Sequence, residues 1–370
     1  MAQTAFFWNE RCFWHSGGNY ASVAPVGGLI EPLKGGGLPE NPETKRRLKS
    51  LMDVTGLIDE LECPKAAPAT EEDLRRVHPA SYLNNFKDAC AAGGGELTMG
   101  TPFGSDGFEI AAQSAGLVKE AVFKVLRGTA RNGYALSRPP GHHCLPDQSM
   151  GFCLLANIAI AVEAALVEGL ASRVAVVDWD VHHGNGTEAI FLNRNDVLTI
   201  SLHQENNYPR DSGGVDTRGC GKGEGFNFNI PLLPGGGHDA YLHAFERIVL
   251  PALRDFQPDA IIVACGFDAS GLDPLSRMLA AAETFREMTV RMMHLAAEMC
   301  DGHLVLAHEG GYSEVYVPFC GHSVIQTLAG SSIFAPDPFE DRLRKQQPND
   351  RFCRFQRDII DEYATGFGFA

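Results

Sequence analysis

Residues 172–188 read SRVAVVDWDVHHGNGTE, and this stretch decides the fold. Its first part, 174–177, is an unbroken apolar run, which is typical of a strand buried on both faces of a parallel sheet. The run ends in three polar residues spaced two apart, Asp178, Asp180 and His182. Because side chains of a strand alternate between faces, this spacing predicts that all three point the same way at the strand end. Two carboxylates and an imidazole together favour a divalent metal site. Taken alone, the triplet also fits a polar loop after a buried strand.

Strands and helices alternate along the rest of the chain. Further strands are predicted at 133–137, 197–202, 226–232, 260–265 and 304–307, and helices at 106–126, 152–170, 239–254 and 279–300. This alternation predicts an α/β fold with a mostly parallel sheet covered by helices on both faces. No repeat or linker divides the sequence, so a single domain over 1–370 is expected. Residues 336–370 are charged and aromatic, and they either pack on this domain or form an oligomer contact.

The composition limits the classes of function. The 370 residues are 44% apolar and 21% charged, which is enough apolar material for a large core. A net charge of −15 disfavours nucleic acid as a partner and weakly favours cationic substrates, although acidic surfaces also serve solubility. The ten cysteines contain no CxxC pair, which favours a reducing compartment. Neither a signal peptide nor a membrane span is apparent, so the expected location is the cytoplasm.

Polar residues also follow the other predicted strands. They include His142 and His143 after 133–137, Ser201 and His203 at the end of 197–202, Asp268 after 260–265, and Tyr312 after 304–307. Ligands in open α/β sheets bind at the carboxyl ends of the strands, so these residues are expected to share one site with the central triplet.

The residue types in this set predict amide hydrolysis without a covalent intermediate. Asp180, His182 and Asp268 would balance the charge of a divalent ion and leave a position open for water and substrate, as catalytic zinc sites do. A neighbouring histidine would take the proton of the water and return it to the leaving group. A tyrosine hydroxyl such as that of Tyr312 would stabilise the oxyanion.

With these residues assembled, the sequence resembles the zinc-dependent histone deacetylase family, in particular its class II members and the bacterial deacetylase-like amidohydrolases. The motifs that carry the resemblance are RPPGHH (138–143), GFC (151–153), VVDWDVHHGNGT (176–187), ISLH (200–203), GFDASGLDPL (266–275) and EGGY (309–312). They span about half of the chain in family order. The resemblance implies the arginase–deacetylase fold, whose central sheet is mainly parallel with about eight strands.

The resemblance also implies a role for each matching residue. Asp180, His182 and Asp268 match the zinc ligands, in agreement with the spacing argument. The other catalytic positions are the tandem histidines His142 and His143, their respective partners Asp178 and Asn185, and the carbonyl-binding Tyr312. The substrate positions are Phe152 and Tyr208 in the aromatic wall of an acyl-lysine tunnel, Gly151 as its backbone contact, and Leu275, Gly310 and Gly311. A structural potassium ion is implied at Asp178, Asp180, His182, Ser201 and Leu202.

Four positions distinguish this chain within the family. Asn185 stands where class I enzymes have Asp, so His143 lacks a charged partner and its pKa should be lower, which leaves the acid and base roles of the two histidines open. Tyr208 replaces a common Phe, and its hydroxyl either bonds a substrate or faces solvent. Tyr312, rather than the His of weakly active class IIa members, favours real activity. Leu275 stands where a polyamine-selective member has a Glu gatekeeper, which argues against polyamine specialisation.

The sequence therefore predicts a zinc amidohydrolase that removes acetyl or other short acyl groups from amines such as acetyl-lysine. The main alternative is an acetylpolyamine amidohydrolase, which the acidic composition favours. A dinuclear manganese ureohydrolase shares the fold class, but the Asp-Trp-Asp-Val-His run and Tyr312 suit one metal and a carbonyl. A non-catalytic acyl-lysine binding module would be expected to lack a ligand or the tyrosine. The natural substrate stays open, as does the choice between monomer, dimer and tetramer.

Overall fold

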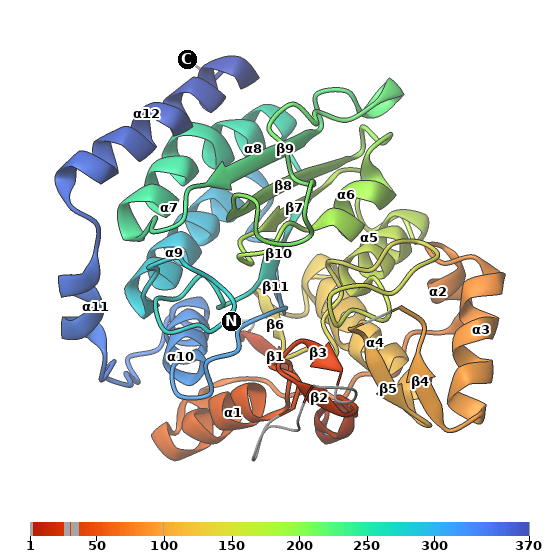
Figure 1. Cartoon of the computed structure of the whole chain (residues 1–370). Coiled ribbons are helices and arrows are strands. Elements are labelled where there is room, and N and C mark those ends of the chain that lie inside the picture. Colours follow the sequence, from red (N-terminus) through yellow and green to blue (C-terminus); the bar gives the residue numbers. More distant parts are fainter. Residues whose placement is uncertain (1–2, 26–29, 31–36, 99, 370) are drawn as a thin grey trace.

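The computed structural model describes residues 3–25, 30, 37–98 and 100–369, and its centre is a parallel sheet (Figure 1). In spatial order the seven strands of this sheet are β1 (Ala5–Phe7), β6 (Gly133–Ala135), β11 (Leu304–His308), β10 (Ala260–Cys265), β7 (Val174–Asp178), β8 (Val197–Gln204) and β9 (Asn227–Leu232). Every neighbouring pair is parallel. The α/β fold is thus confirmed, with seven strands within the described residues where about eight were expected. In the described part of the chain, two short hairpins lie outside the sheet, β2 (Tyr20–Ala21) with β3 (Ala24–Pro25), and β4 (Gly94–Glu96) with β5 (Pro102–Gly104).

Strand β7 shows why the sheet is buried on both faces. Val174 and Val176 belong to one hydrophobic cluster, whereas Ala175 and Val177 belong to the other. All four side chains are almost fully buried, because successive residues of a strand point to opposite faces and helices cover each face here. An apolar run without alternation is the sequence that such a strand requires.

The helices form one layer on each face of the sheet (Figure 1). The cluster around Val174 contains side chains of α2 (Glu71–Arg75), α3 (Ala80–Ala91), α4 (Gly107–Leu126), α5 (Asn157–Val167) and α6 (Asn185–Phe191). The cluster around Ala175 contains side chains of α1 (Glu43–Thr55), α7 (His238–Ala244), α8 (Leu250–Phe256), α9 (Ala282–Met299) and α10 (Val317–Ala329). A π-helical turn at Phe245–Val249 joins α7 to α8, so the helix predicted at 239–254 is one continuous rod with a local irregularity.

Two stretches differ from their predicted description. The helix expected from residue 152 begins only at Asn157, because Phe152 has a left-handed backbone (φ 68°) that no α-helix contains. Residues 336–370 form α11 (Glu340–Gln346) and α12 (Asp350–Phe367). Helix α12 packs on the domain, and the ring of Phe367 lies 5.0 Å from that of Phe228 in β9. The packing on the domain, one of the two alternatives for this segment, is thus observed, and the oligomer contact stays a prediction.

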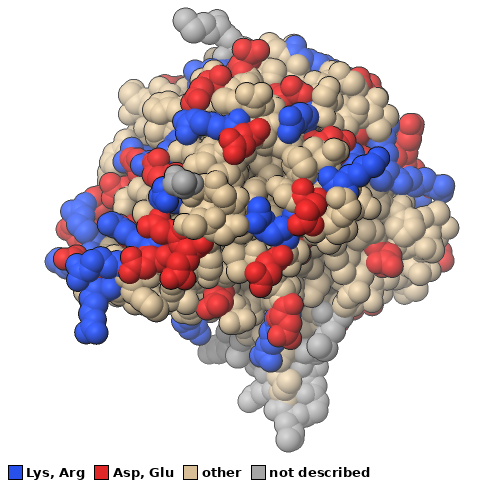
Figure 2. Space-filling view, turned by 90° about the horizontal axis from the view of Figure 1, so that it is seen from above, with Lys and Arg blue, Asp and Glu red and all other residues tan. Residues whose placement is uncertain are grey.

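The charges of the surface are mixed. Lys and Arg side chains lie among Asp and Glu side chains over the face shown in Figure 2, so the net negative charge is not gathered in one patch there. Among the described residues, no helix combines the length and the apolar character needed to cross a membrane.

Candidate active site

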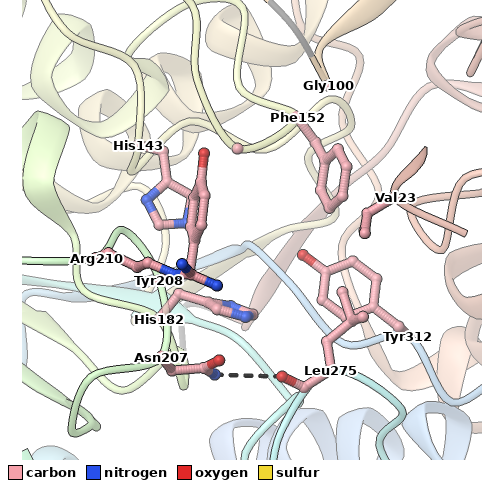
Figure 3. Close-up of a pocket in the computed structure, with 11 residues that line it drawn as sticks. Val23, Gly100, His143, Phe152, His182, Asn207, Tyr208, Arg210, Leu275 and Tyr312 are labelled. Atoms are coloured by element: carbon pink, nitrogen blue, oxygen red, sulfur yellow. Dashed lines mark hydrogen bonds between the residues drawn. The ribbon is translucent and has the colours of Figure 1, made fainter. Parts of the chain in front are cut away.

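A cavity of about 360 Å³ lies beside the carboxyl ends of the strands. Its lining residues are Val23, Gly100, His143, Gly151, Phe152, His182, Asn207, Tyr208, Arg210, Leu275 and Tyr312. Burial changes along it: His143, His182 and Tyr312 are 3, 6 and 9% exposed, and we call this end the floor. Val23, Tyr208 and Arg210 are exposed, and we call this end the mouth. Figure 3 shows Tyr208 and Arg210 on one side of the cavity, facing Phe152 and Tyr312 on the other.

Three donor groups converge beneath the floor. Atoms of Asp180, His182 and Asp268 that can ligate a metal lie within 4.8 Å of one another, and all three side chains are buried. His182 Nδ1 is 3.0 Å from Asp180 Oδ1 and 3.1 Å from Asp268 Oδ2. Asp268 Oδ2 is buried and accepts no hydrogen bond from the described residues. A buried carboxylate oxygen without a hydrogen-bond donor, close to an imidazole and a second carboxylate, fits the donor set of a metal site.

Backbone hydrogen bonds aim the two carboxylates. Asp268 Oδ1 accepts from the backbone NH of Val181 (2.8 Å), which leaves Oδ2 free for a ligand. Asp180 Oδ2 accepts from the backbone NH of Gly310 (2.8 Å), and its Oδ1 accepts from that of His182 (2.9 Å). Since β7 already ends at Asp178, strand alternation does not explain how Asp180 and His182 converge. The predicted convergence occurs, but turn hydrogen bonds after the strand produce it.

Two glycines leave room for this arrangement. A Cβ on Gly266 would lie 2.2 Å from Asp180 Oδ2, and a Cβ on Gly310 would lie 2.2 Å from Asp268 Oδ2. Both distances are far inside van der Waals contact, so any other residue would displace the carboxylates. Gly310 and Gly311, predicted to contact the substrate, do not line the cavity, and the structure assigns Gly310 this packing role instead.

The electrostatics of the floor call for a cation. Burial and the charge of Asp180 raise the pKa of Asp268 to about 6. Burial and the charge of Asp268 raise the pKa of Asp273 well above its usual value. The floor thus concentrates carboxylates in a region from which water is largely excluded, and a divalent ion would neutralise them. The donor set of two carboxylates and one imidazole fits zinc with a fourth position open.

The tandem histidines lie side by side with different partners. Their ring centroids are 4.0 Å apart. His142 Nδ1 is 2.9 Å from Asp178 Oδ2, whereas His143 Nδ1 is 2.7 Å from Asn185 Oδ1. The amide oxygen can only accept, so it holds a proton on Nδ1 of His143 and leaves Nε2 as the basic nitrogen. The structure places both predicted partners beside their histidines.

The two histidines differ in pKa because different charges surround them. Burial lowers the pKa of His142, but the charges of Asp180 and Asp178 outweigh burial and raise it well above its usual value. Burial lowers the pKa of His143 well below its usual value, and the neighbouring His142 and His182 add to this. The direction for His143 agrees with the sequence argument, although burial rather than the missing carboxylate is the largest cause.

Aromatic side chains form the walls between floor and mouth. The rings of Phe152 and Tyr312 meet edge to face with centroids 5.8 Å apart. Across the cavity, the ring of Tyr208 stands at 87° to that of His143, with centroids 5.0 Å apart. Burial and the charges of Asp268, Asp180 and Asp273 raise the pKa of Tyr312 well above its usual value, so its hydroxyl keeps its proton and can donate. All three predicted wall or oxyanion residues therefore line one cavity.

Two carboxylates that support the site had no assigned role from the sequence. Asp273 Oδ2 accepts from the backbone NH of Tyr312 (2.7 Å) and its Oδ1 from that of Leu275 (2.9 Å), which fixes the backbone of Tyr312 relative to that of Leu275. Glu309 Oε2 accepts from the backbone NH groups of Gly141 (2.6 Å) and His142 (3.1 Å). Both residues lie inside motifs found in the sequence. Their role could have been suspected because each is a carboxylate in a glycine-containing segment that follows a strand. The mouth residues Val23 and Arg210 gave no signal, since they lie in surface loops.

The chain is similar to histone deacetylases in both sequence and structure. The family model of the histone deacetylase domain matches residues 38–328. The chain is 54% identical over 366 residues to a histone deacetylase-like amidohydrolase from Pseudomonas aeruginosa, covering 99% of this chain and 96% of that protein. It is 35% identical to a probable deacetylase from Archaeoglobus fulgidus, over 90% of this chain and 94% of that protein. The crystal structure of the HD domain of HDA15 superposes with a TM-score of 0.81 at 30% identity, covering 99% of this chain and 98% of that one.

Proposed function

The chain belongs to the histone deacetylase family and is a hydrolase, and we propose that it removes acetyl or other short acyl groups from acyl-lysine side chains. The observation that carries this proposal is the floor of the cavity. There a metal-ligand set, two histidines of opposite pKa shift and a protonated phenol surround one space. These are the parts that hydrolysis of an amide by an activated water requires.

We propose one zinc ion per chain, held by Asp180, His182 and Asp268. When bound, it would supply a Lewis acid that lowers the pKa of a water molecule and polarises the acyl carbonyl. Support for placing the ion here is the donor geometry, since the atoms of these three residues meet at one point. His142, Cys153 and Glu309 form a second group of three possible donors, but burial raises the pKa of the Cys153 thiol well above its usual value, which disfavours the thiolate that a metal needs. Support for catalysis rather than mere binding is that no part of the machinery is replaced by an inert residue.

The protein groups around the ion would divide the proton transfers. His143, neutral because its pKa is lowered, is able to accept a proton from water through Nε2. His142, whose positive charge Asp178 favours, stabilises negative charge developing nearby and is able to protonate the leaving amine. Tyr312 donates a hydrogen bond to the acyl oxygen as that oxygen becomes negative. The aromatic rings of Phe152 and Tyr208 confine the alkyl chain of the substrate between them.

A structural potassium ion is also part of the proposal, at Asp178, Asp180, His182, Ser201 and Leu202. Its support is the register of the sheet, in which Ser201 of β8 lies directly beside Asp178 of β7. Such an ion would hold the two strands that carry the floor. It would act on stability and on the position of the ligands, not on the reacting atoms.

Acetylpolyamines are the second candidate substrates, because the net charge of −15 favours cations at long range. Against them stands the neutral Leu275 in the cavity wall, which offers no charge to a polyamine ammonium.

We propose an intracellular protein that does not act on nucleic acid, and a homodimer or homotetramer is compatible with the proposal. The assignment of all of 1–370 to one catalytic domain remains a prediction, of which the family model covers 38–328.

The experiment that tests this function is hydrolysis of an acetyl-lysine amide and of an acetylated polyamine by the purified protein. Each substrate is assayed with zinc, with a chelator, and in potassium or sodium buffer. We expect zinc-dependent hydrolysis of the acetyl-lysine amide, faster than that of the polyamine, and higher thermal stability in potassium. Absence of turnover with one bound zinc per chain would contradict the proposal and direct attention to longer acyl groups.

A further inference from the structure

Arg210 stands apart from the other residues that line the cavity. It is exposed at the mouth, and no other Lys, Arg, Asp or Glu is among the lining residues. In the described part of the chain, no carboxylate lies within ion-pair distance of its guanidinium. The chain has 46 acidic against 31 basic residues, so an arginine without a partner at this place is unexpected. Its charge is available to a ligand.

The loop that carries Arg210 is fixed on both sides of it. The backbone carbonyl of Tyr208 accepts a hydrogen bond from the backbone NH of His183 (3.1 Å). Ser212 Oγ donates to the carbonyl of Pro209 (3.0 Å) and lies 3.0 Å from Nδ1 of His183. His183 directly follows the predicted ligand His182, so the loop is tied to the segment that forms the floor. The backbone position of Arg210 is therefore set, while no carboxylate of the described residues pairs with its guanidinium.

The chemistry of the mouth follows from what a substrate places there. An acyl-lysine that reaches the floor threads its alkyl chain between Phe152 and Tyr208, which leaves the peptide around it at the mouth. A guanidinium binds a carboxylate in a bidentate manner and repels ammonium groups. Leu275 and Val23, which also line the cavity, carry no charge that would offset this preference.

We propose that Arg210 is a specificity-determining residue that selects acyl-lysine peptides with an aspartate or glutamate beside the acylated lysine. It disfavours acylated amines that carry further ammonium groups, a class that includes acetylated polyamines. This inference rests on the proposed function, and it adds the substrate class. The overall negative charge and the mouth thus act in opposite directions on a cationic substrate, and the nearer charge prevails because salt screens the distant ones.

The test uses three acetyl-lysine peptides that differ only in the residue after the acetyl-lysine, which is Asp, Asn or Lys. The zinc-loaded protein is compared with the variants Arg210→Gln and Arg210→Glu. The matched controls are Arg354→Gln and Arg354→Glu in α12, since Arg354 is also exposed and has no ion-pair partner among the described residues. The controls change the net charge by the same amount away from the mouth.

We expect wild type to prefer the Asp peptide over the Lys peptide by about fivefold in kcat/KM, which is the usual size of one exposed charge pair. The preference should reside mainly in KM and shrink at high salt, because the Debye length falls to about 3 Å at 1 M. Arg210→Gln should abolish the preference and Arg210→Glu should reverse it, whereas both Arg354 variants should keep it. This pattern would assign the selectivity to Arg210.

Two outcomes would overturn the assignment of selectivity to Arg210, and only the second would also overturn the proposed function. In the first outcome, wild type hydrolyses the Asn peptide, but the ratio of kcat/KM for the Asp peptide to that for the Lys peptide is unchanged in Arg210→Gln, or changes equally in the Arg354 variants. Arg210 then does not set specificity, and the proposed function stands. If zinc-loaded wild type hydrolyses none of the peptides, the acyl-lysine function falls and the role of Arg210 falls with it.

Discussion

The floor and the mouth of the cavity are built by opposite means. At the floor, the donor atoms of Asp180, His182 and Asp268 are buried, and backbone NH groups hold both carboxylates. At the mouth, Tyr208 is 37% exposed, and the guanidinium of Arg210 has no ion-pair partner in the described chain. The floor is rigid because each group constrains the next. At the mouth, hydrogen bonds fix the backbone of the loop that carries Arg210, while the side chains of Tyr208 and Arg210 are exposed.

This difference separates two parts of the function. A reaction needs its groups held within fractions of an ångström, and burial makes their electrostatic interactions strong. Selection among substrates needs accessible groups, whose charges are screened and whose effects are small. Substitutions at the floor should therefore change the reaction itself by orders of magnitude, while those at the mouth should change preference by small factors.

The largest effect is expected from Asp268→Asn. The amide keeps the size of the side chain but removes the charge that a metal ligand needs. We expect bound zinc to fall from about one ion per chain to nearly none, and kcat/KM to fall by more than about 10³-fold. Metal analysis and an acetyl-lysine assay measure the two. The control is Asp255→Asn, which removes the same charge from an exposed position of α8. Full zinc content in Asp268→Asn would show that the ligand set is assigned incorrectly.

Tyr312→Phe should come next. The ring remains packed against Phe152, but the hydroxyl that the structure keeps protonated is lost. Removing one such oxyanion donor typically lowers kcat by about 10²–10³-fold. We expect a loss of this size with KM and zinc content nearly unchanged, measured by steady-state kinetics and metal analysis on the same preparation. A loss confined to KM would place the hydroxyl in ground-state binding instead.

The same division decides how much was predictable from sequence. The residues of the floor lie just after the carboxyl ends of parallel strands. These ends can be recognised in the sequence, because a buried strand is an apolar run and polar residues follow it. Asp178, Asp268 and Tyr312 were found in this way, and the resemblance supplied the pairing of each histidine with its partner. Strand alternation nonetheless gave the wrong reason for the convergence of Asp180 and His182, because hydrogen bonds between a side chain and a later NH group shape that turn.

Apart from Tyr208, which the resemblance supplied, the mouth was not predictable, and the reason is physical. Val23 and Arg210 lie in loops that reach the cavity only through the tertiary fold, and neither residue type has a spacing that marks a wall. The irregular segment before α5 was also missed, because its apolar residues resemble a helix while Phe152 adopts a positive φ. Positive φ at a bulky residue depends on tertiary contacts and not on local propensity.

A smaller effect, on pH dependence, is expected from Asn185→Asp. His143 must be neutral to accept a proton, and its pKa is lowered in the wild-type site. A carboxylate in place of the amide oxygen, 2.7 Å from Nδ1, would stabilise the imidazolium and raise the pKa. The acidic limb of kcat/KM should then move up by about one pH unit, so more alkaline conditions are needed for full activity. An unchanged limb would mean that His143 is not the base that this limb reports.

The smallest effect is expected from Tyr208→Phe, a substitution at the mouth. It tests whether a residue of the mouth affects substrate binding without affecting the reaction. The ring would still stand against His143, so the wall of the tunnel persists and only a hydroxyl is lost. If that hydroxyl bonds the substrate, its contribution is that of one hydrogen bond exposed to water, and kcat/KM should fall by about threefold, mainly through KM. The comparison with Tyr312→Phe is direct, since both variants remove a phenol oxygen from the same cavity. A fall in kcat as large as that of Tyr312→Phe would make Tyr208 part of the reaction machinery, and the boundary between floor and mouth would then have to lie beyond it.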